Sequence, residues 1–178
     1  YRGDAFWKAH AQQLWSRDLF ETALSRSHTL TPSRKGFNHI FPTGDELRDL
    51  AKDAIAYQYE HRDGLKCTMI LLNGVVQDFN FAAHIEGEAE PFSTQMYLPM
   101  PPARTTLANF FSPQVNHVET MFLTGKAAYP VERTLLTSGL VEAGVESLFQ
   151  NQQRIETPHL DVAYQPTRQS TFWDSAIS

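Results

Sequence analysis

The stretch LKCTMILLNGVVQDFNFAAHIEG (residues 65–87) decides the fold, because side chains alternate in character on both sides of Asn73 and Gly74. Alternation with a period of two is typical of β-strands, and Asn-Gly is the strongest short signal for a hairpin turn. Residues 65–72 and residues 75–86 are therefore predicted to form two antiparallel strands joined at a tight turn.

Two further strands are predicted on either side of this hairpin. Residues 55–60 alternate in the same way and are followed by the turn signal Arg-Asp-Gly at residues 62–64. On the other side, FSTQMYL (residues 92–98) follows a break at residues 87–91. The sequence thus predicts an antiparallel meander of four strands.

Helical patterns precede and follow the strands. Two short amphipathic pieces meet at Trp15 and Ser16, and the Ser16 hydroxyl is predicted to cap the second. Thr43 and Glu46 have the spacing of a capping box, which opens another short helix. Ser-Pro at residues 112–113 and Thr-Gly at residues 124–125 mark the beginning and end of a later helix.

The longest predicted helix, PVERTLLTSGLVEAGVESLFQ (residues 130–150), contains Gly139 and Gly144. Glycine costs about 1 kcal/mol relative to alanine inside a helix, so two glycines need a structural reason. Together with Ala143 and Ser147 they form a smooth strip, on which we expect a sheet or helix backbone to pack closely. Because apolar residues cover most of its circumference, we expect this helix to be buried on more than one side.

These elements predict an α+β fold, a mainly antiparallel sheet with helices packed on one face. A chain of 178 residues is long enough for one domain with a sizeable core. We expect a single substrate-binding and association domain over residues 1–164 and a C-terminal tail over residues 165–178.

Composition argues against several classes of function. The net charge is −5 and there is no basic stripe, so no nucleic-acid partner is expected. The single cysteine, Cys67, excludes an intrachain disulfide, and its apolar surroundings favour a core residue over a nucleophile. No apolar run has membrane-spanning length, so no membrane partner is predicted and the expected location is cytoplasmic. Because the chain does not begin with methionine, we expect a processed, truncated or partial polypeptide.

The third predicted strand has one apolar face, which includes Phe79 and Phe81, and one unusually polar face. Amide, carboxylate and imidazole groups on the polar face suit a ligand with many hydroxyls, such as a sugar or polyol. The candidate substrate-binding residues are Asp78, Asn80, His84, Gln95 and Tyr97. The favoured interpretation of this face, however, is that it is solvated or covered by another subunit, since antiparallel sheets commonly leave one face outside the core.

No other motif predicts catalysis or metal binding. His159 and Asp161 have a spacing compatible with metal ligation on a strand, but no companion pair accompanies them, so a structural role is favoured and no metal is predicted. The sequence has neither a nucleophile elbow nor a glycine-rich phosphate loop. The catalytic residues are therefore unknown.

Four segments in a fixed order carry a resemblance to a known family. They are EHRDGLKCTMILLNGVVQDFNFAAHIEG (residues 60–87), FSTQMYLP (92–99), MFLTGKAAYPVERTLLTSGLVEAGVESL (121–148) and RIETPHLDVAY (154–164). Between residues 4 and 164 the chain resembles the C-terminal half of bacterial proteins distantly related to the glucose-fructose oxidoreductase and inositol dehydrogenase family.

The resemblance implies both a fold and a function. In that family an N-terminal Rossmann domain binds NAD or NADP, and a C-terminal α/β domain offers a sheet for substrate binding and subunit association. The family's catalytic lysine and histidine would precede Tyr1, so neither is carried over to this chain. No cofactor is expected on the chain alone, while NAD(P) is implied for the complete protein.

The expected function is accordingly the substrate-binding and oligomerisation part of an NAD(P)-dependent sugar or polyol oxidoreductase, as a fragment or as one chain of a split enzyme. The expected partners are further copies of the chain or a separate Rossmann-domain chain. The alternative is a noncatalytic binding or scaffold module that uses the open sheet face to hold a protein partner.

Overall fold

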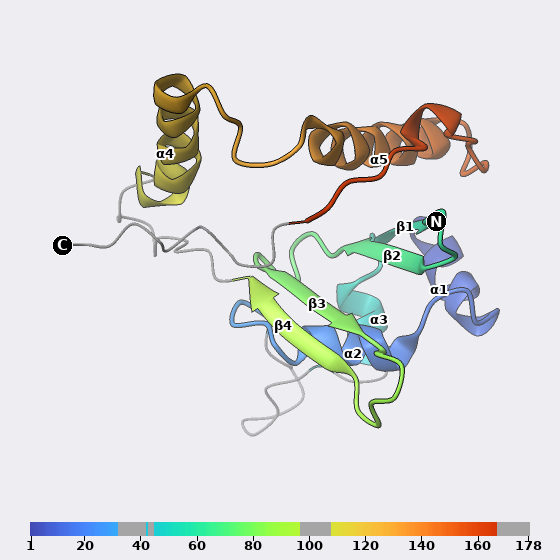
Figure 1. Cartoon of the computed structure of the whole chain (residues 1–178). Helices are drawn as coiled ribbons and strands as arrows, with labels where there is room; N and C mark the ends of the chain where they lie inside the picture. Colours follow the sequence, from blue (N-terminus) through green and yellow to red (C-terminus); the bar gives the residue numbers. More distant parts are fainter. Residues whose placement is uncertain (32–41, 43–44, 97–107, 167–178) are drawn as a thin grey trace. The chain divides into compact units, whose positions relative to one another are not determined.

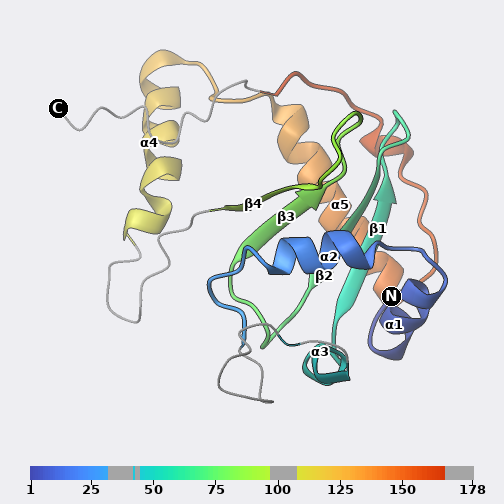
Figure 2. The same cartoon turned by 90° about the horizontal axis from the view of Figure 1, so that it is seen from below.

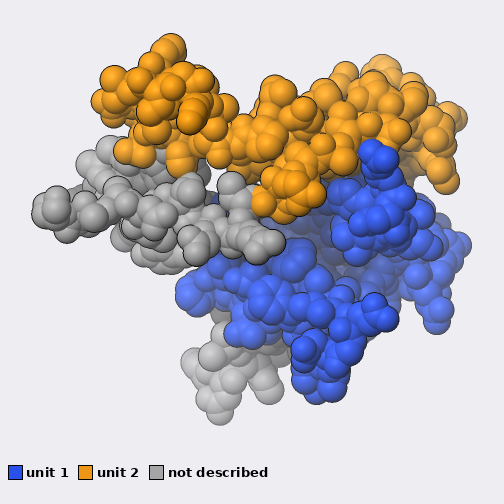
Figure 3. Space-filling view, in the orientation of Figure 1, with its two compact units in different colours: residues 1–97 blue, residues 98–178 orange. Residues whose placement is uncertain are grey.

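The computed structural model of the chain describes residues 1–31, 42, 45–96 and 108–166 (Figure 1). They belong to two compact units, residues 1–97 and residues 98–178, which Figure 3 distinguishes by colour. The described elements are five α-helices, one short 3-10 helix and four strands, which confirms the α+β class. The single domain expected over residues 1–164 stays a prediction. The tail from residue 167 onward lies outside the described residues.

Three helices belong to the first unit, namely α1 (Asp4–Ala11), α2 (Arg17–Leu24) and α3 (Asp45–Leu50) (Figure 1). The predicted cap of α2 is confirmed, because the Ser16 hydroxyl accepts a hydrogen bond from the Leu19 amide at 3.2 Å. Local sequence signals were sufficient here, since a cap and its helix lie within a few residues of one another.

The core of the first unit is built around the completely buried side chain of Phe6. The Trp15 ring stacks on Phe6 with centroids 4.6 Å apart, and the Trp15 indole donates a hydrogen bond to the Phe6 carbonyl at 3.0 Å. Stacked rings with the indole N–H satisfied are the favourable arrangement for buried aromatic residues. The other buried members of this cluster are Ala9, Phe20, Leu24, Leu47, Ala51, Ala54, Ala56, Leu72 and Val75.

Four strands form where the alternation predicted them, but they do not form one meander. Strand β1 (Ile55–Glu60) pairs antiparallel with β2 (Lys66–Leu71), and β3 (Phe79–Ala83) pairs antiparallel with β4 (Phe92–Met96). The described residues therefore form two separate two-stranded sheets, without pairing between β2 and β3. The predicted hairpin at Asn73 and Gly74 is wrong.

The backbone between β2 and β3 is held by the segment that follows α2. The Thr31 amide donates to the Val75 carbonyl at 2.8 Å, and the Gln77 amide donates to the Thr29 hydroxyl at 2.8 Å. Val75 itself is buried in the core. Residues 75–77 thus find partners far away in the sequence, which shortens the third strand to Phe79–Ala83.

Helix α2 packs against the ribbon formed by β3 and β4, and Figure 2 shows it crossing in front of β3. The face turned towards α2 is the polar one. Asn80 and Gln95 are partly buried, whereas Phe79 and Phe81 on the opposite face are more than half exposed. We predicted that the apolar face of this strand is the one suited to the core. This prediction is wrong, because the polar face is the more buried one.

The second unit contains α4 (Ala108–Thr124), α5 (Val131–Phe149) and the 3-10 helix η1 (Pro158–Leu160). Helix α4 begins earlier than the predicted cap at Ser112, but it ends as predicted at Gly125, whose φ of 68° suits glycine. No described helix is both long enough and apolar enough to cross a membrane.

Part of the smooth strip on α5 is covered by the chain that returns after the helix. A Cβ added to the buried Gly139 would lie 2.3 Å from Cδ2 of Leu160, and the Ser147 hydroxyl donates to the Gln153 carbonyl at 2.5 Å. The expected close approach is thus made by an irregular segment and η1. The expected burial of α5 on more than one side is wrong for the described structure, in which Val131 and Phe149 are at least 75% exposed.

The contact between Gly139 and Leu160 leads to a testable prediction. Gly139→Ala should gain about 1 kcal/mol of helix propensity but lose about 2 kcal/mol through overpacking against Leu160. We expect a net loss of about 1 kcal/mol in the native chain and a gain of about 1 kcal/mol when Leu160→Ala is also present. Thermal unfolding of the four proteins of this cycle, followed by circular dichroism, measures both values. If the two substitutions changed the unfolding free energy in a strictly additive way, the result would contradict the contact between Gly139 and Leu160.

Candidate functional site

Asp78 is the centre of the polar group that the sequence singled out. Its Oδ1 accepts from the Ser27 hydroxyl at 2.9 Å and from Asn80 Nδ2 at 2.6 Å. Its Oδ2 accepts from the His28 amide at 2.9 Å and from Gln95 Nε2 at 2.7 Å, with a longer bond of 3.3 Å from the Thr29 amide. Three of the five predicted residues, Asp78, Asn80 and Gln95, are therefore brought together.

The surroundings of Asp78 stabilise its ionised form. Partial burial acts to raise the pKa of Asp78, but the hydrogen bonds from Asn80, Ser27, the His28 amide and Gln95 outweigh it, so the pKa lies below its ordinary value. A carboxylate with a lowered pKa is a poor general base at neutral pH, because it binds a proton too weakly.

The donors around Asp78 also show what the carboxylate does in the fold. Ser27, His28 and Thr29 follow α2, Asn80 lies in β3 and Gln95 lies in β4. The carboxylate therefore joins three segments of the first unit. Since both of its oxygens are occupied by donors of the chain itself, little of its accepting capacity is left for the hydroxyls of a sugar.

The remaining two predicted residues are not part of this cluster. His84 lies beyond the end of β3, where its Nε2 is 3.7 Å from Oδ2 of Asp18, and both side chains are more than 60% exposed. Tyr97 lies outside the described residues. The assignment of the five residues to a substrate site stays a prediction, of which the structure assembles three.

Cys67 lies on β2 opposite Tyr59 of β1. Burial raises the pKa of the Cys67 thiol, and the same effect raises the pKa of the Tyr59 hydroxyl. A thiol with a raised pKa holds little thiolate at neutral pH and is a weak nucleophile. Within the described ranges, no three histidine, cysteine or acidic side chains come close enough together to bind a metal ion.

The outer face of the β3–β4 ribbon carries the largest apolar side chains of the two strands. Phe79, Phe81, Phe92 and Met96 are 59%, 54%, 50% and 53% exposed, and the rings of Phe81 and Phe92 lie 6.4 Å apart. In the strand register Phe79 is opposite Met96, and Phe81 is opposite Thr94. We call these four apolar side chains the aromatic face. It is the most exposed apolar surface of the two small sheets.

Comparisons with protein-family models, with curated proteins and with solved structures found no match. The resemblance to the oxidoreductase family therefore stays an expectation from the sequence.

Two features of the first unit were missed by reasoning from the sequence. The first is the exposure of the aromatic face, whose residues were expected to face the core. The second is a pocket lined by residues of α1, α3 and the beginning of α2. The spacing of Trp7 and His10 in α1 places both on one side of the helix, but no sequence signal brings α3 to them.

Proposed function

We propose that this chain is an association domain that forms a homodimer through the aromatic face. The observation that carries the proposal is the half exposure of Phe79, Phe81, Phe92 and Met96 side by side on one ribbon. Scattered apolar residues on a surface are ordinary, but a contiguous aromatic patch marks an interaction site. This role matches the association half of the function that the sequence resemblance implies.

A second copy of the chain is an occupant that the charges of the ribbon do not oppose. The chain has a net charge of −5, so two copies repel each other unless the contact itself is neutral. The residues of β3 and β4 on this face are apolar or uncharged, so a two-fold contact brings no like charges together. In such a contact the same patch serves both subunits, and two ribbons stack face to face as in a β-sandwich.

The size of the aromatic face sets the expected strength of the dimer. Four large side chains that each expose about half of roughly 200 Å² give an area of roughly 400 Å² per copy. A standard stable interface buries about 800 Å² per partner. We therefore expect a reversible dimer with a dissociation constant in the micromolar range, rather than an obligate one.

Sedimentation equilibrium over a wide range of protein concentrations tests this proposal. The expected result is a weight-average mass that rises from that of one 20.2 kDa chain to twice that value. A constant monomer mass at all concentrations would contradict the dimer. A stable trimer or larger species would contradict the two-fold contact.

The oxidoreductase part of the expectation is a separate proposal with its own test. It rests on the sequence resemblance, which implies NAD(P) for the complete protein and a sugar or polyol as substrate. This proposal can be tested by purifying the full-length gene product, identifying any bound nucleotide by mass spectrometry and assaying the protein on a panel of sugars. A dimer without nucleotide or turnover would favour the noncatalytic binding module instead.

A further inference from the structure

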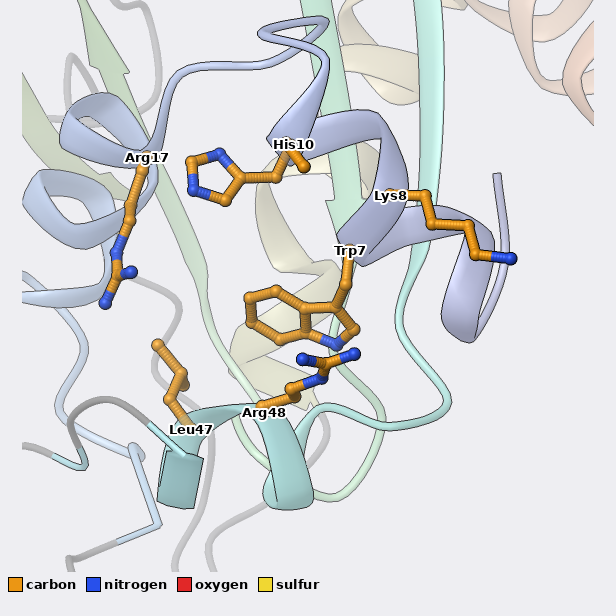
Figure 4. Close-up of a pocket in the computed structure, with 7 residues that line it drawn as sticks. Trp7, Lys8, His10, Arg17, Leu47 and Arg48 are labelled. Atoms are coloured by element: carbon orange, nitrogen blue, oxygen red, sulfur yellow. The ribbon is translucent and has the colours of Figure 1, made fainter.

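The first unit contains a pocket of about 380 Å³ between α1, α3 and the beginning of α2 (Figure 4). Its volume lies within the range of small-molecule sites. The lining residues are Trp7, Lys8, His10, Ala11, Arg17, Leu47 and Arg48. Three of these side chains are basic and none is acidic, in a chain whose net charge is −5. The lining of the pocket is therefore positively charged, although the chain as a whole is negatively charged.

The aromatic and basic groups of the pocket are arranged around its open centre. The six-membered ring of Trp7 faces this centre, with His10, Arg17 and Leu47 on the other sides (Figure 4). His10 is held in place by the Trp15 ring, whose centroid lies 4.7 Å away. The pocket thus has a flat indole wall opposite charged donors, which suits a flat anionic molecule.

Unused hydrogen-bond donors line one side of the pocket. Trp7 Nε1 is buried and has no acceptor among the described residues, and the Arg48 guanidinium lies beside it (Figure 4). Both groups are donors, so neither can satisfy the other. Within the described part of the chain, the Arg48 guanidinium forms no ion pair. An acceptor oxygen placed between them would satisfy both at once.

Arg17 adds a second cationic group with donors to spare. Its Nε is 2.7 Å from Oε1 of Glu21 in an ion pair one helical turn apart, which leaves its two terminal nitrogens for other acceptors. A guanidinium that is held by one carboxylate is preorganised, so it loses little side-chain entropy on binding an oxyanion.

We propose that this pocket binds a small molecule in which a phosphate or carboxylate is attached to a flat ring. The oxyanion accepts hydrogen bonds from Arg48 and Trp7 Nε1, and the ring lies against the indole of Trp7. Arg17, on the opposite side of the open centre, adds positive charge without contacting the same oxyanion (Figure 4). This site is independent of the proposed dimer, because it uses none of the residues of the aromatic face.

The test uses the full chain labelled with nitrogen-15 and follows its indole N–H signals by NMR, with phenyl phosphate and benzoate as probes. Trp7→Phe assigns the Trp7 signal, and the Trp15 indole, bonded to the Phe6 carbonyl, provides an internal comparison. The expected result is a saturable shift of the Trp7 signal at millimolar probe. Whichever probe saturates at the lower concentration identifies the oxyanion.

A matched pair of variants separates the pocket from general electrostatic attraction. Arg48→Gln should weaken binding about tenfold, the loss expected for a hydrogen bond between charged groups. Lys8→Gln removes the same charge from a side chain that points away from the centre, and it should change the affinity by less than about twofold (Figure 4). Equal losses in both variants, or no saturation with either probe, would overturn the proposal. Equal affinity for inorganic phosphate and phenyl phosphate would overturn the role of the indole wall.

Discussion

Asp78→Ala is expected to lower the free energy of unfolding of the first unit by about 3 kcal/mol. The substitution removes the acceptor for the Ser27 hydroxyl, the His28 amide and Gln95 Nε2, among others. Hydrogen bonds to a charged group contribute about 1.5 to 3 kcal/mol each, and partial exposure reduces this for a set of several bonds. Urea unfolding followed by the fluorescence of Trp7 and Trp15 measures the change.

The contribution of Asp78 should also depend on pH in a defined direction. Its pKa is lower in the folded state than its ordinary value of 3.8, so the unfolded chain takes up the proton first as the pH falls. The stabilisation is therefore complete well above pH 3.8 and is lost as the pH falls through the folded value. The difference in unfolding free energy between the native chain and Asp78→Asn should be constant near neutral pH and shrink in acid.

Asp63→Asn is a suitable control, because the hydrogen bond that Asp63 accepts within the described residues is a local one, from the Leu65 amide at 3.1 Å in the turn between β1 and β2. It should lower the unfolding free energy by less than about 1 kcal/mol. If Asp78→Ala and Asp63→Asn had equal effects, Asp78 would not be the link between α2 and the ribbon. A difference that grows in acid would contradict the lowered pKa.

Elements stabilised by nearby residues were predicted well from the sequence. The Ser16 cap of α2, the end of α4 at Gly125 and the range of α5 depend on side chains within one or two turns. The positions of the four strands were also close, because alternation is a local pattern. These signals do not depend on tertiary contacts.

The pairing of the strands could not be predicted in the same way. Asn73 and Gly74 favour a hairpin locally, but the backbone that follows them bonds to Thr29 and Thr31, more than forty residues earlier. Hydrogen-bond partners that are so distant in the sequence leave no signal in the residues around the turn. Tertiary pairing thus overrides the local turn preference.

In the candidate site, too, local patterns predicted one part and tertiary contacts determined the rest. Asp78, Asn80 and Gln95 meet because alternation and register place them on one face of the ribbon. Alternation does not specify which face meets the helices, however, and Ser27 supplies a polar partner where an apolar one was expected. A partly buried carboxylate with its own donors turns the polar face inward and leaves the rings of Phe79 and Phe81 outside.

Phe81→Glu is expected to weaken the proposed dimer at least a hundredfold. Phe81 lies in the middle of β3, with its ring 54% exposed and 6.4 Å from that of Phe92. A two-fold contact through this face places the two introduced carboxylates in the same apolar interface, where each loses water and repels the other. A hundredfold change in a micromolar dissociation constant leaves only monomer at the concentrations of an ordinary sedimentation experiment.

The same substitution at a different exposed ring provides the control. Phe122 on α4 is 79% exposed, and Phe122→Glu adds the same charge outside the aromatic face. It should leave the mass distribution of the native chain unchanged, while Phe81→Glu gives a monomer that still unfolds cooperatively in urea, because more than half of Phe81 is already exposed in the single copy. If Phe81→Glu still dimerises, or if Phe122→Glu dissociates the dimer equally well, then the aromatic face is not the contact.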